Sequence, residues 1–329
     1  MVATTPGVET TDQTQFDVTG TGPLALGLSG AVTVSSSPVV TTFGIPLASA
    51  DVAATSLSNS ARGRLFSYET GAALTDINAP ARRVFMALSQ SATGLWTADA
   101  QDFFDASVRW LLGETIIDKV RIMPLGDSIT RGTNNAWSYR RDLAGLAAVD
   151  QCRVDFVGTQ NGADTPLPTT IGDFDRDHEG HGGFRTDQID GAINGYLAGN
   201  VPDIVLLHLG TNDIGQSTSL PAAKESMRSI ITKIRAENPN VVIYLAQIIN
   251  RAPSFDAAVQ SYNVLMEQLA LEEDTSQSPV FLVDQNTGYS NSVHNQSDQL
   301  HPNDLGDALM ASRWYTPLQT EISSVCNGN

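Results

Sequence analysis

A serine that follows an apolar strand is the strongest chemical signal in this chain. Residues 126–130 are Gly-Asp-Ser-Ile-Thr, and they come directly after the apolar run Val120–Leu125. A turn from a strand into a helix can hold the Ser128 hydroxyl at the edge of a sheet, beside backbone N–H groups that can receive negative charge. Because Gly-Asp-Ser also occurs in ordinary turns, Ser128 indicates a nucleophile only if the chain also supplies a base.

Two later clusters supply a base and its partners. Residues 298–302 are Asp-Gln-Leu-His-Pro, and residues 210–213 are Gly-Thr-Asn-Asp. His301 is the candidate base, since imidazole exchanges protons near neutral pH. Asp298 is near enough in the chain to orient that imidazole and to stabilise its charged form, and the Asn212 amide can donate to an oxyanion. Together these residues predict a serine hydrolase.

The same residues also have structural interpretations. Asp298 can be an N-cap or turn residue, and Asn212 can be an ordinary turn asparagine. The conjunction of the clusters favours catalysis, because each of them follows a predicted strand or precedes a predicted helix. We expect Pro302 at the first position of the last helix, where proline is well tolerated.

The elements that must position these clusters begin near residue 119. Apolar runs predict five strands, at Val120–Leu125, Arg153–Val157, Ile204–Leu209, Val241–Ala246 and Val280–Val283. Helical spacing predicts helices at Trp137–Val149, Thr186–Leu197, Pro221–Glu237, Phe255–Leu271, and after Pro302 to about Ile322. This alternation predicts an α/β fold with a five-stranded parallel sheet covered on both faces, which binds ligands at the carboxyl ends of its strands. We assign residues 116–329 to this catalytic domain.

Residues 1–115 differ in composition and form a smaller N-terminal α/β segment. Short β-like runs occur at Ala31–Val34 and Arg64–Tyr68, a buried strand is expected at Arg82–Leu88, and a helix is expected from Thr97 to Gly113. Residues 66–71 and 79–84 resemble the closing portion of glutamine-amidotransferase-like domains. Such domains use a cysteine nucleophile, and residues 1–151 contain no cysteine. We therefore expect an accessory, non-catalytic segment.

Composition narrows the possible partners. The chain has 329 residues, of which 41% are hydrophobic, and its 19 Lys and Arg against 36 Asp and Glu give a net charge of -17. A field of this sign repels phosphate backbones and anionic lipid, so we expect no nucleic-acid or membrane partner. Neutral substrates such as esterified sugars are compatible with it.

Location and redox state are less strongly indicated. Residues 1–6 contain neither a basic start nor an apolar signal core. We expect a secreted or extracellular protein whose signal peptide is not part of this sequence, and a cytoplasmic location stays open. Cys152 and Cys326 are the only cysteines. They are compatible with one disulfide and equally with two thiols.

From about residue 119 to residue 320 the chain resembles the SGNH hydrolase superfamily, also called GDSL esterases. Residues 126–130, 210–213 and 298–302 match the first, third and fifth sequence blocks of that superfamily. The resemblance implies that Ser128 is the nucleophile, that Asp298 and His301 are the acid and the base, and that Asn212 is an oxyanion donor.

The second block of the superfamily supplies a glycine whose N–H completes the oxyanion hole. Residues 178–184, His-Glu-Gly-His-Gly-Gly-Phe, match it best. We choose Gly183, because a helical pattern follows it directly, so that the expected oxyanion hole comprises the Ser128 and Gly183 N–H groups and the Asn212 amide. Gly182 and Gly158 are alternatives to Gly183.

Further residues narrow the resemblance to bacterial carbohydrate esterases of the acetyl xylan esterase type. They are residues 128–132, 138–143 and 154–158, together with the later His-Glu-Gly-His run. The resemblance implies a three-layer α/β/α, flavodoxin-like fold, removal of acetyl groups from polysaccharides such as acetylated xylan, and no cofactor. A lipase or thioesterase with a longer acyl preference and a non-catalytic carbohydrate-binding module are the alternatives.

Residues 173–179 carry alternating carboxylates, which are calcium ligands in other proteins. The glycine and the terminal glutamate of an EF-hand are not in the required places, so a solvated acidic loop is the favoured interpretation. His178 and His181 lack a third zinc ligand, and we expect no metal. His208 lies inside an apolar strand and is expected to be a core residue.

Overall fold

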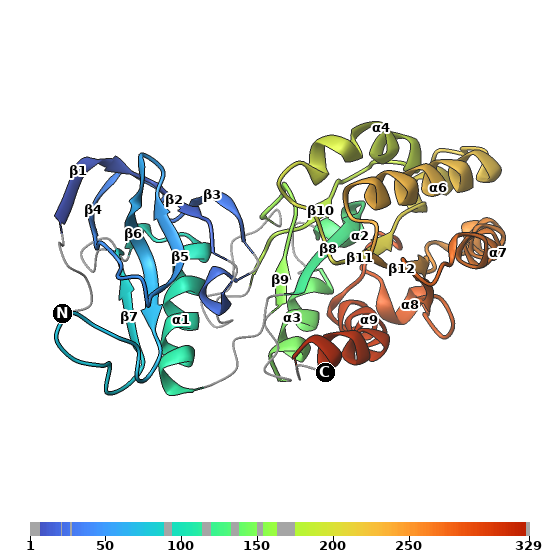
Figure 1. Ribbon diagram of the computed structural model, residues 1–329. Helices are drawn as coiled ribbons and strands as arrows, with labels where there is room; N and C mark the ends of the chain where they lie inside the picture. The colour runs from blue at the N-terminus through green and yellow to red at the C-terminus, as the bar shows by residue number, and fades with distance from the viewer. Residues whose placement is uncertain are drawn as a thin grey trace. The chain divides into compact units, whose positions relative to one another are not determined.

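The computed structural model describes residues 7–20, 22–26, 28–88, 94–113, 120–132, 138–149, 154–162 and 175–326. The chain divides into two compact units, Met1–Asp118 and Lys119–Asn329 (Figure 1). We call them the N-terminal unit and the second unit. No helix in the described ranges is long and apolar enough to cross a membrane.

The second unit is built on a parallel sheet of six strands. These are β8 (Val120–Gly126), β9 (Val154–Phe156), β10 (Glu179–Gly180), β11 (Ile204–His208), β12 (Val242–Gln247) and β13 (Val280–Asp284). From β8 the sheet continues through β11 and β12 to β13, while β9 and β10 pair with different parts of the other edge of β8. All these pairs are parallel, which confirms the predicted α/β fold with a parallel sheet. The sixth strand, β10, was not predicted because two residues carry no periodic signal.

Helices connect the strands at the expected places. The longer ones are α3 (Arg140–Val149), α4 (Thr186–Leu197), α6 (Leu220–Glu237), α7 (Asp256–Glu273) and α9 (Asp304–Cys326). Short helical turns follow the carboxyl ends of strands or precede α7 and α9: α2 (Ser128–Arg131), α5 (Thr211–Gly215), η3 (Pro253–Phe255) and α8 (Asn291–His294). The expected limits of α4 agree with the structure, and those of α6 and α7 differ by one or two residues. Trp137, the expected start of α3, lies outside the described residues.

Alternate residues of the strands face two separate apolar clusters. Met123 and Leu125 of β8 pack with α4, α6 and α7, whereas Val120 and Ile122 pack with α3 and α9. In Figure 1 these two groups of helices lie on opposite sides of the sheet. Strands covered in this way are apolar at nearly every position, as β11 is. Polar groups are therefore concentrated at the strand ends.

The last helix begins two residues later than expected, at Asp304 rather than Pro302. The side chain of Asn303 explains this start, because its Oδ1 accepts hydrogen bonds from the N–H groups of Leu305 (3.0 Å) and Gly306 (3.1 Å). This is N-cap geometry. Pro302 instead belongs to the loop before the helix.

The N-terminal unit contains an antiparallel sheet in the order β3-β2-β5-β6-β7. Its strands are β2 (Gln15–Val18), β3 (Gly30–Thr33), β5 (Asp51–Ser56), β6 (Asn59–Tyr68) and β7 (Arg83–Met86), and β1 (Gly7–Gln13) pairs separately with β4 (Val39–Phe43). A short turn, η1 (Pro23–Ala25), and helix α1 (Ala98–Leu112) pack against the sheet, with Phe103 and Trp110 of α1 in the core.

The limits of α1 agree with the sequence. The Thr97 hydroxyl caps its start by accepting from the N–H of Ala100, and Gly113 ends it in the left-handed conformation, at φ 81°. The expectation of a buried strand at Arg82–Leu88 was wrong in one respect. β7 has only β6 as a neighbour and all four of its residues are half-buried, because it is an edge strand.

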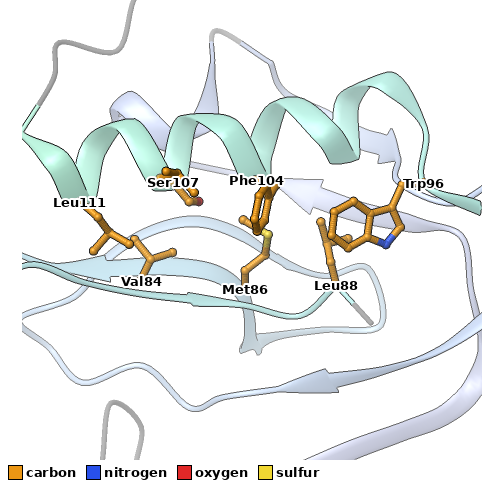
Figure 2. Close-up of a pocket in the computed structure, with 8 residues that line it drawn as sticks. Val84, Met86, Leu88, Trp96, Phe104, Ser107 and Leu111 are labelled. Atoms are coloured by element: carbon orange, nitrogen blue, oxygen red, sulfur yellow. The ribbon is translucent and has the colours of Figure 1, made fainter. Parts of the chain in front are cut away.

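Between β7 and α1 lies an apolar pocket of about 580 Å³. Figure 2 shows it between the helix and the strand, lined by Val84, Met86, Leu88, Trp96, Phe104, Ser107, Val108 and Leu111. The single hydroxyl among them, on Ser107, donates to the Phe103 carbonyl within α1 (2.7 Å). The pocket therefore offers mainly apolar contacts, together with the indole N–H of Trp96, which has no hydrogen-bond partner among the described residues.

Candidate active site

Ser128 lies where β8 turns into α2. Gly126 ends β8 at a point where a Cβ atom would overlap the carbonyl oxygen of His208, so only glycine fits there. The next residue, Asp127, caps α2, because its Oδ1 accepts from the N–H of Ile129 (2.9 Å). Ser128 is then the first residue of the helix and is half-buried. The turn thus presents its hydroxyl at the carboxyl edge of the sheet.

His301 and Asp298 lie beside this hydroxyl. The Oγ of Ser128 is 2.9 Å from Nε2 of His301, and Nδ1 of the same ring is 2.6 Å from Oδ2 of Asp298. Since a carboxylate only accepts hydrogen bonds, Nδ1 carries the proton and Nε2 is free to accept from the serine hydroxyl. The three residues that the sequence analysis selected thus form one hydrogen-bonded row.

The carboxylate of Asp298 is held from both sides. Its Oδ1 accepts from the N–H groups of Leu300 and His301, both at 3.0 Å, while Oδ2 accepts from the imidazole. Burial alone would raise the pKa of Asp298, but these hydrogen bonds outweigh it and leave the pKa below its ordinary value. Asp298 is therefore ionised beside the imidazole and can stabilise a positive charge on it.

The loop that carries His301 has its own hydrogen bonds. Gln296 spans it, because its N–H donates to the His301 carbonyl (2.8 Å) and its Nε2 donates to the Pro302 carbonyl (2.8 Å). Gln299 adopts a positive φ of 56° at the turn, and its carbonyl accepts from the side-chain amide of Asn291 in α8 (3.0 Å). These hydrogen bonds thus fix the loop that positions the imidazole of His301.

Asn212 and Gly183 follow the strands on either side of β8. Gly126 is in register with Gly180 of β10 on one side and with His208 of β11 on the other. Ser128, Gly183 and Asn212 come two, three and four residues after these positions. Parallel strands end at the same edge of a sheet, so the three residues lie at one edge.

Two contacts join the loops of Asn212 and Gly183. Nδ2 of Asn212 donates to the carbonyl of Phe184 (3.0 Å). The buried carboxylate of Asp213 accepts from the N–H (3.0 Å) and the hydroxyl (2.8 Å) of Thr186, at the start of α4. Asp213 and Thr186 were not selected from the sequence, although the Asp in Gly-Thr-Asn-Asp was a visible signal.

Gly183 has the geometry of an exposed turn. Its φ is 81°, in the left-handed region that favours glycine, and a Cβ there would meet nothing within 4 Å. Its N–H has no hydrogen-bond partner in the described part of the chain. By contrast, a Cβ on Gly182 would meet the Arg131 guanidinium at 2.8 Å, and one on Gly158 would overlap the His178 backbone. The backbone overlap gives Gly158 a packing reason to be glycine, whereas the end of the Arg131 side chain can move away from a Cβ on Gly182.

Asp127 and Arg140 were also missed from the sequence. Burial raises the pKa of Asp127 to about 6, although the N–H of Ile129 and the charge of His301 both oppose the rise. The buried guanidinium of Arg140 donates to three carbonyls, those of Thr130 (2.9 Å), Arg131 (3.0 Å) and Arg176 (2.8 Å). It ties the end of α2 to the acidic loop. The SYRRDL stretch at residues 138–143, which the resemblance singled out, contains it.

The acidic loop is only partly described, since residues 173 and 174 lie outside the described ranges. The carboxylate of Asp175 accepts from the N–H groups of Phe156 (2.8 Å) and Asp177 (3.1 Å), and that of Glu179 accepts from Thr159 and His181. The residues that the structure describes contain no group of three or more His, Cys, Asp or Glu side chains that could hold a metal ion.

The other histidines that the sequence analysis considered, His208 and His178, are buried and make structural contacts. Burial lowers the pKa of His208 to about 4, and this histidine lies in the core as expected. Burial also lowers the pKa of His178 to about 3, and the ring spans from the Gly162 carbonyl (2.7 Å) to the Gly180 N–H (2.9 Å). Cys152 lies outside the described residues, so both alternatives, one disulfide with Cys326 or two thiols, stay predictions.

A parallel α/β sheet with a serine, a histidine and an aspartate in one hydrogen-bonded row at its carboxyl edge is typical of serine hydrolases. The comparison with known families agrees with this class. Residues 125–309, more than half of the chain, match the model of the GDSL-like Lipase/Acylhydrolase family. The chain belongs to this family, which confirms the resemblance found in the sequence.

Similar proteins include a multidomain esterase of Ruminococcus flavefaciens, 28% identical over 223 residues. That match covers 61% of this chain and 28% of the relative, so the chain spans well under half of the relative's length. Among solved structures, a family 3 carbohydrate esterase from Talaromyces cellulolyticus is 30% identical with a TM-score of 0.57, covering 62% of this chain and 99% of that one. A mutant acetyl esterase, crystallised with an acetate ion, is also 30% identical, with a TM-score of 0.54 and coverage of 63% and 99%.

Proposed function

We propose that the second unit hydrolyses short-chain carboxylic esters, acetyl esters of polysaccharides such as xylan foremost, through an acyl-enzyme on Ser128. The observation that carries the proposal is the hydrogen-bonded row from Ser128 through His301 to Asp298, with distances of 2.9 and 2.6 Å. A serine needs such a base to become a nucleophile, and the base needs an orienting acid.

In the proposed reaction, Nε2 of His301 takes the proton of Ser128 as Oγ attacks the ester carbonyl carbon. Asp298 holds the imidazole in the required tautomer and stabilises the imidazolium. As the tetrahedral intermediate collapses, His301 gives its proton to the departing alcohol oxygen. A water molecule, deprotonated by the same histidine, then attacks the acyl carbon, and the acid and free Ser128 are released.

The oxyanion of the intermediate is assigned to three donors, namely the N–H groups of Ser128 and Gly183 and the side-chain amide of Asn212. The exposed turn of Gly183, with its φ of 81° and the open space around it, supports this choice, whereas a Cβ on Gly158 would overlap the His178 backbone. One hydrogen of the Asn212 amide is bound by the Phe184 carbonyl, and the second is available to the substrate. Donors fixed before the reaction stabilise the developing charge most effectively.

The acetyl preference rests on the similar proteins. One is named an acetyl esterase and another a family 3 carbohydrate esterase. The net charge of -17 is compatible with a neutral acetylated sugar and unfavourable for a nucleic acid or an anionic surface. We further propose a secreted enzyme without a cofactor, with a three-layer α/β/α catalytic domain from about residue 116, and a non-catalytic accessory domain at residues 1–115. The two apolar clusters on opposite faces of the sheet support the three layers.

The proposal is tested by measuring the hydrolysis of p-nitrophenyl esters with acyl chains of two to twelve carbons, with Ser128→Ala as the control. The highest rate at two carbons, lost in the variant, would support a short-chain serine esterase and justify an assay on acetylated xylan. A maximum at eight carbons or more would favour a lipase. Absence of turnover at every length would favour the non-catalytic binding module.

A further inference from the structure

A second carboxylate–imidazole pair, Glu179 and His181, lies just before Gly183 in the chain and is separate from the proposed catalytic row. Nε2 of His181 is 2.5 Å from Oε1 of Glu179. Glu179 is the first residue of β10 and its side chain is fully buried, while that of His181 is 13% exposed. Neither side chain has a role in the proposed reaction.

The hydrogen bonds that Glu179 accepts determine which nitrogen of the His181 ring carries a hydrogen. The N–H of Thr159 donates to Oε2 (2.7 Å), and the hydroxyl of Thr159 donates to Oε1 (2.8 Å). A buried carboxylate that receives these donors is an acceptor for the imidazole as well, so Nε2 of His181 carries a hydrogen. The ring is therefore fixed in orientation by a charge-assisted hydrogen bond.

The backbone of His181 joins β8 to the glycine turn. Its N–H donates to the Gly126 carbonyl (2.9 Å), two residues before Ser128, and its carbonyl accepts from the N–H of Phe184 (3.2 Å). The turn that results encloses Gly182 and Gly183. A displacement of His181 would therefore move the Gly183 N–H with it.

The ring of His181 also supports Phe184. It stacks between the rings of Tyr196, with centroids 4.4 Å apart, and Phe184, with centroids 5.2 Å apart. The carbonyl of Phe184 is the acceptor for Nδ2 of Asn212 (3.0 Å). A continuous path of contacts thus runs from Glu179 through His181 and Phe184 to the amide of Asn212.

We propose that Glu179 and His181 are positioning residues for the oxyanion donors, acting on Gly183 through the turn and on Asn212 through the Phe184 carbonyl. This inference rests on the proposed function, since it assigns no chemistry of its own to the pair. The pair acts before the reaction, by holding two donors where the charge of the intermediate develops. Its loss therefore lowers kcat and leaves KM nearly unchanged.

The test is a double-mutant cycle. His181→Phe keeps an aromatic ring between Tyr196 and Phe184 but removes the donor to Glu179. We expect kcat to fall about 10-fold, less than the ~10²–10³-fold loss expected for removing one oxyanion donor outright. Because His181 acts on Gly183 as well as on Asn212, the fall in kcat caused by His181→Phe should be smaller in the Asn212→Ala background than in the wild type, and the part that remains is the part transmitted through Gly183. A merely structural role would lower kcat by the same factor in both backgrounds, which would overturn the proposal, as would an unchanged kcat in His181→Phe.

Two further variants keep the test decisive. Glu179→Gln preserves the shape of the acid and removes its charge. It replaces His181→Phe in the same double-mutant cycle if His181→Phe does not fold. Glu273→Gln is the matched control, because Glu273 is also a mostly buried, ion-paired carboxylate but lies at the end of α7, at the opposite end of the sheet. It should retain wild-type kcat and KM. Absence of turnover by the wild type would instead refute the proposed function itself.

Discussion

The two units of this chain each pack helices against a sheet, yet among the described residues only the second unit brings candidate catalytic side chains together. In the second unit every strand runs in the same direction, so the loops after β8, β10 and β11 meet at one edge and bring Ser128, Gly183 and Asn212 together. In the N-terminal unit the paired strands are antiparallel. Consecutive loops there lie at opposite edges, and the notable hollow is an apolar pocket. Strand direction, more than residue composition, determines where distant residues can meet.

Replacing the proposed base, His301, should cause the largest fall in kcat and so tests most strongly whether the second unit is the catalytic one. His301→Ala removes the acceptor for the Ser128 proton, and kcat should fall on the order of 10⁶-fold, as in other serine hydrolases. The measurement is steady-state hydrolysis of p-nitrophenyl acetate, with thermal unfolding to verify the fold. Substantial turnover by a folded variant would mean that another group is the base.

Asp298→Asn should have the next largest effect. The amide can still accept from the Leu300 and His301 N–H groups but cannot hold the imidazole in the same tautomer, so we expect a loss of up to ~10⁴-fold in kcat. The same assay measures it. An unchanged rate would return Asp298 to the role of a turn residue.

Removing the side-chain amide in Asn212→Ala should lower kcat by ~10²–10³, the usual effect of one oxyanion donor. KM for the same ester should change little, because the donor acts mainly on the charge that develops during the reaction. A rise in KM with unchanged kcat would assign Asn212 to substrate binding rather than to the oxyanion hole.

The stability of the second unit should depend on Asp127. Its folded pKa of about 6 lies above the ordinary value of 3.8, so the folded state holds the proton more tightly than the unfolded state. The resulting stabilisation is complete below about pH 3.8 and is lost as the pH rises through about 6. Asp127→Asn does not titrate, so its free energy of unfolding relative to wild type should rise by on the order of 2 kcal/mol between pH 4 and pH 8. Urea denaturation at both pH values measures this, and a pH-independent difference would contradict it.

The smallest effect is expected in the N-terminal unit. Phe104 lines its apolar pocket and is 50% exposed. Phe104→Ala should leave kcat and KM for small esters unchanged, because the proposed reaction uses only residues of the second unit. A clear loss of esterase activity in a folded variant would show that the N-terminal unit takes part in catalysis.

The sequence predicted the second unit well because its central strands, β8, β11 and β12, are buried on both faces. Runs such as Ile204–His208 are apolar at almost every position and are bounded by polar turns, which is a strong signal. In the N-terminal unit, β5 reads Asp-Val-Ala-Ala-Thr-Ser, and small residues of this kind carry little signal even though four of the six are buried. The strand β5 was missed for this reason, and β1, β2 and β4 were not predicted either.

The residues of the candidate site also differ in how easily the sequence reveals them. Ser128, Asn212, Asp298 and His301 were selected because they occur in short motifs next to predicted elements. Partners that depend on how separate loops fold together, such as Thr186 for Asp213, leave no local pattern. The contact between Glu179 and His181 spans two residues, but its meaning depends on the stacked rings and on Asn212, and only the structure brings these together.

The central claim is that Ser128 is a nucleophile activated by His301. The most direct measurement is covalent labelling of the wild type with a fluorophosphonate, followed by mass spectrometry of the modified peptide. We predict a single adduct on Ser128, formed much more slowly in His301→Ala. No adduct, or an adduct on another residue, would contradict the account.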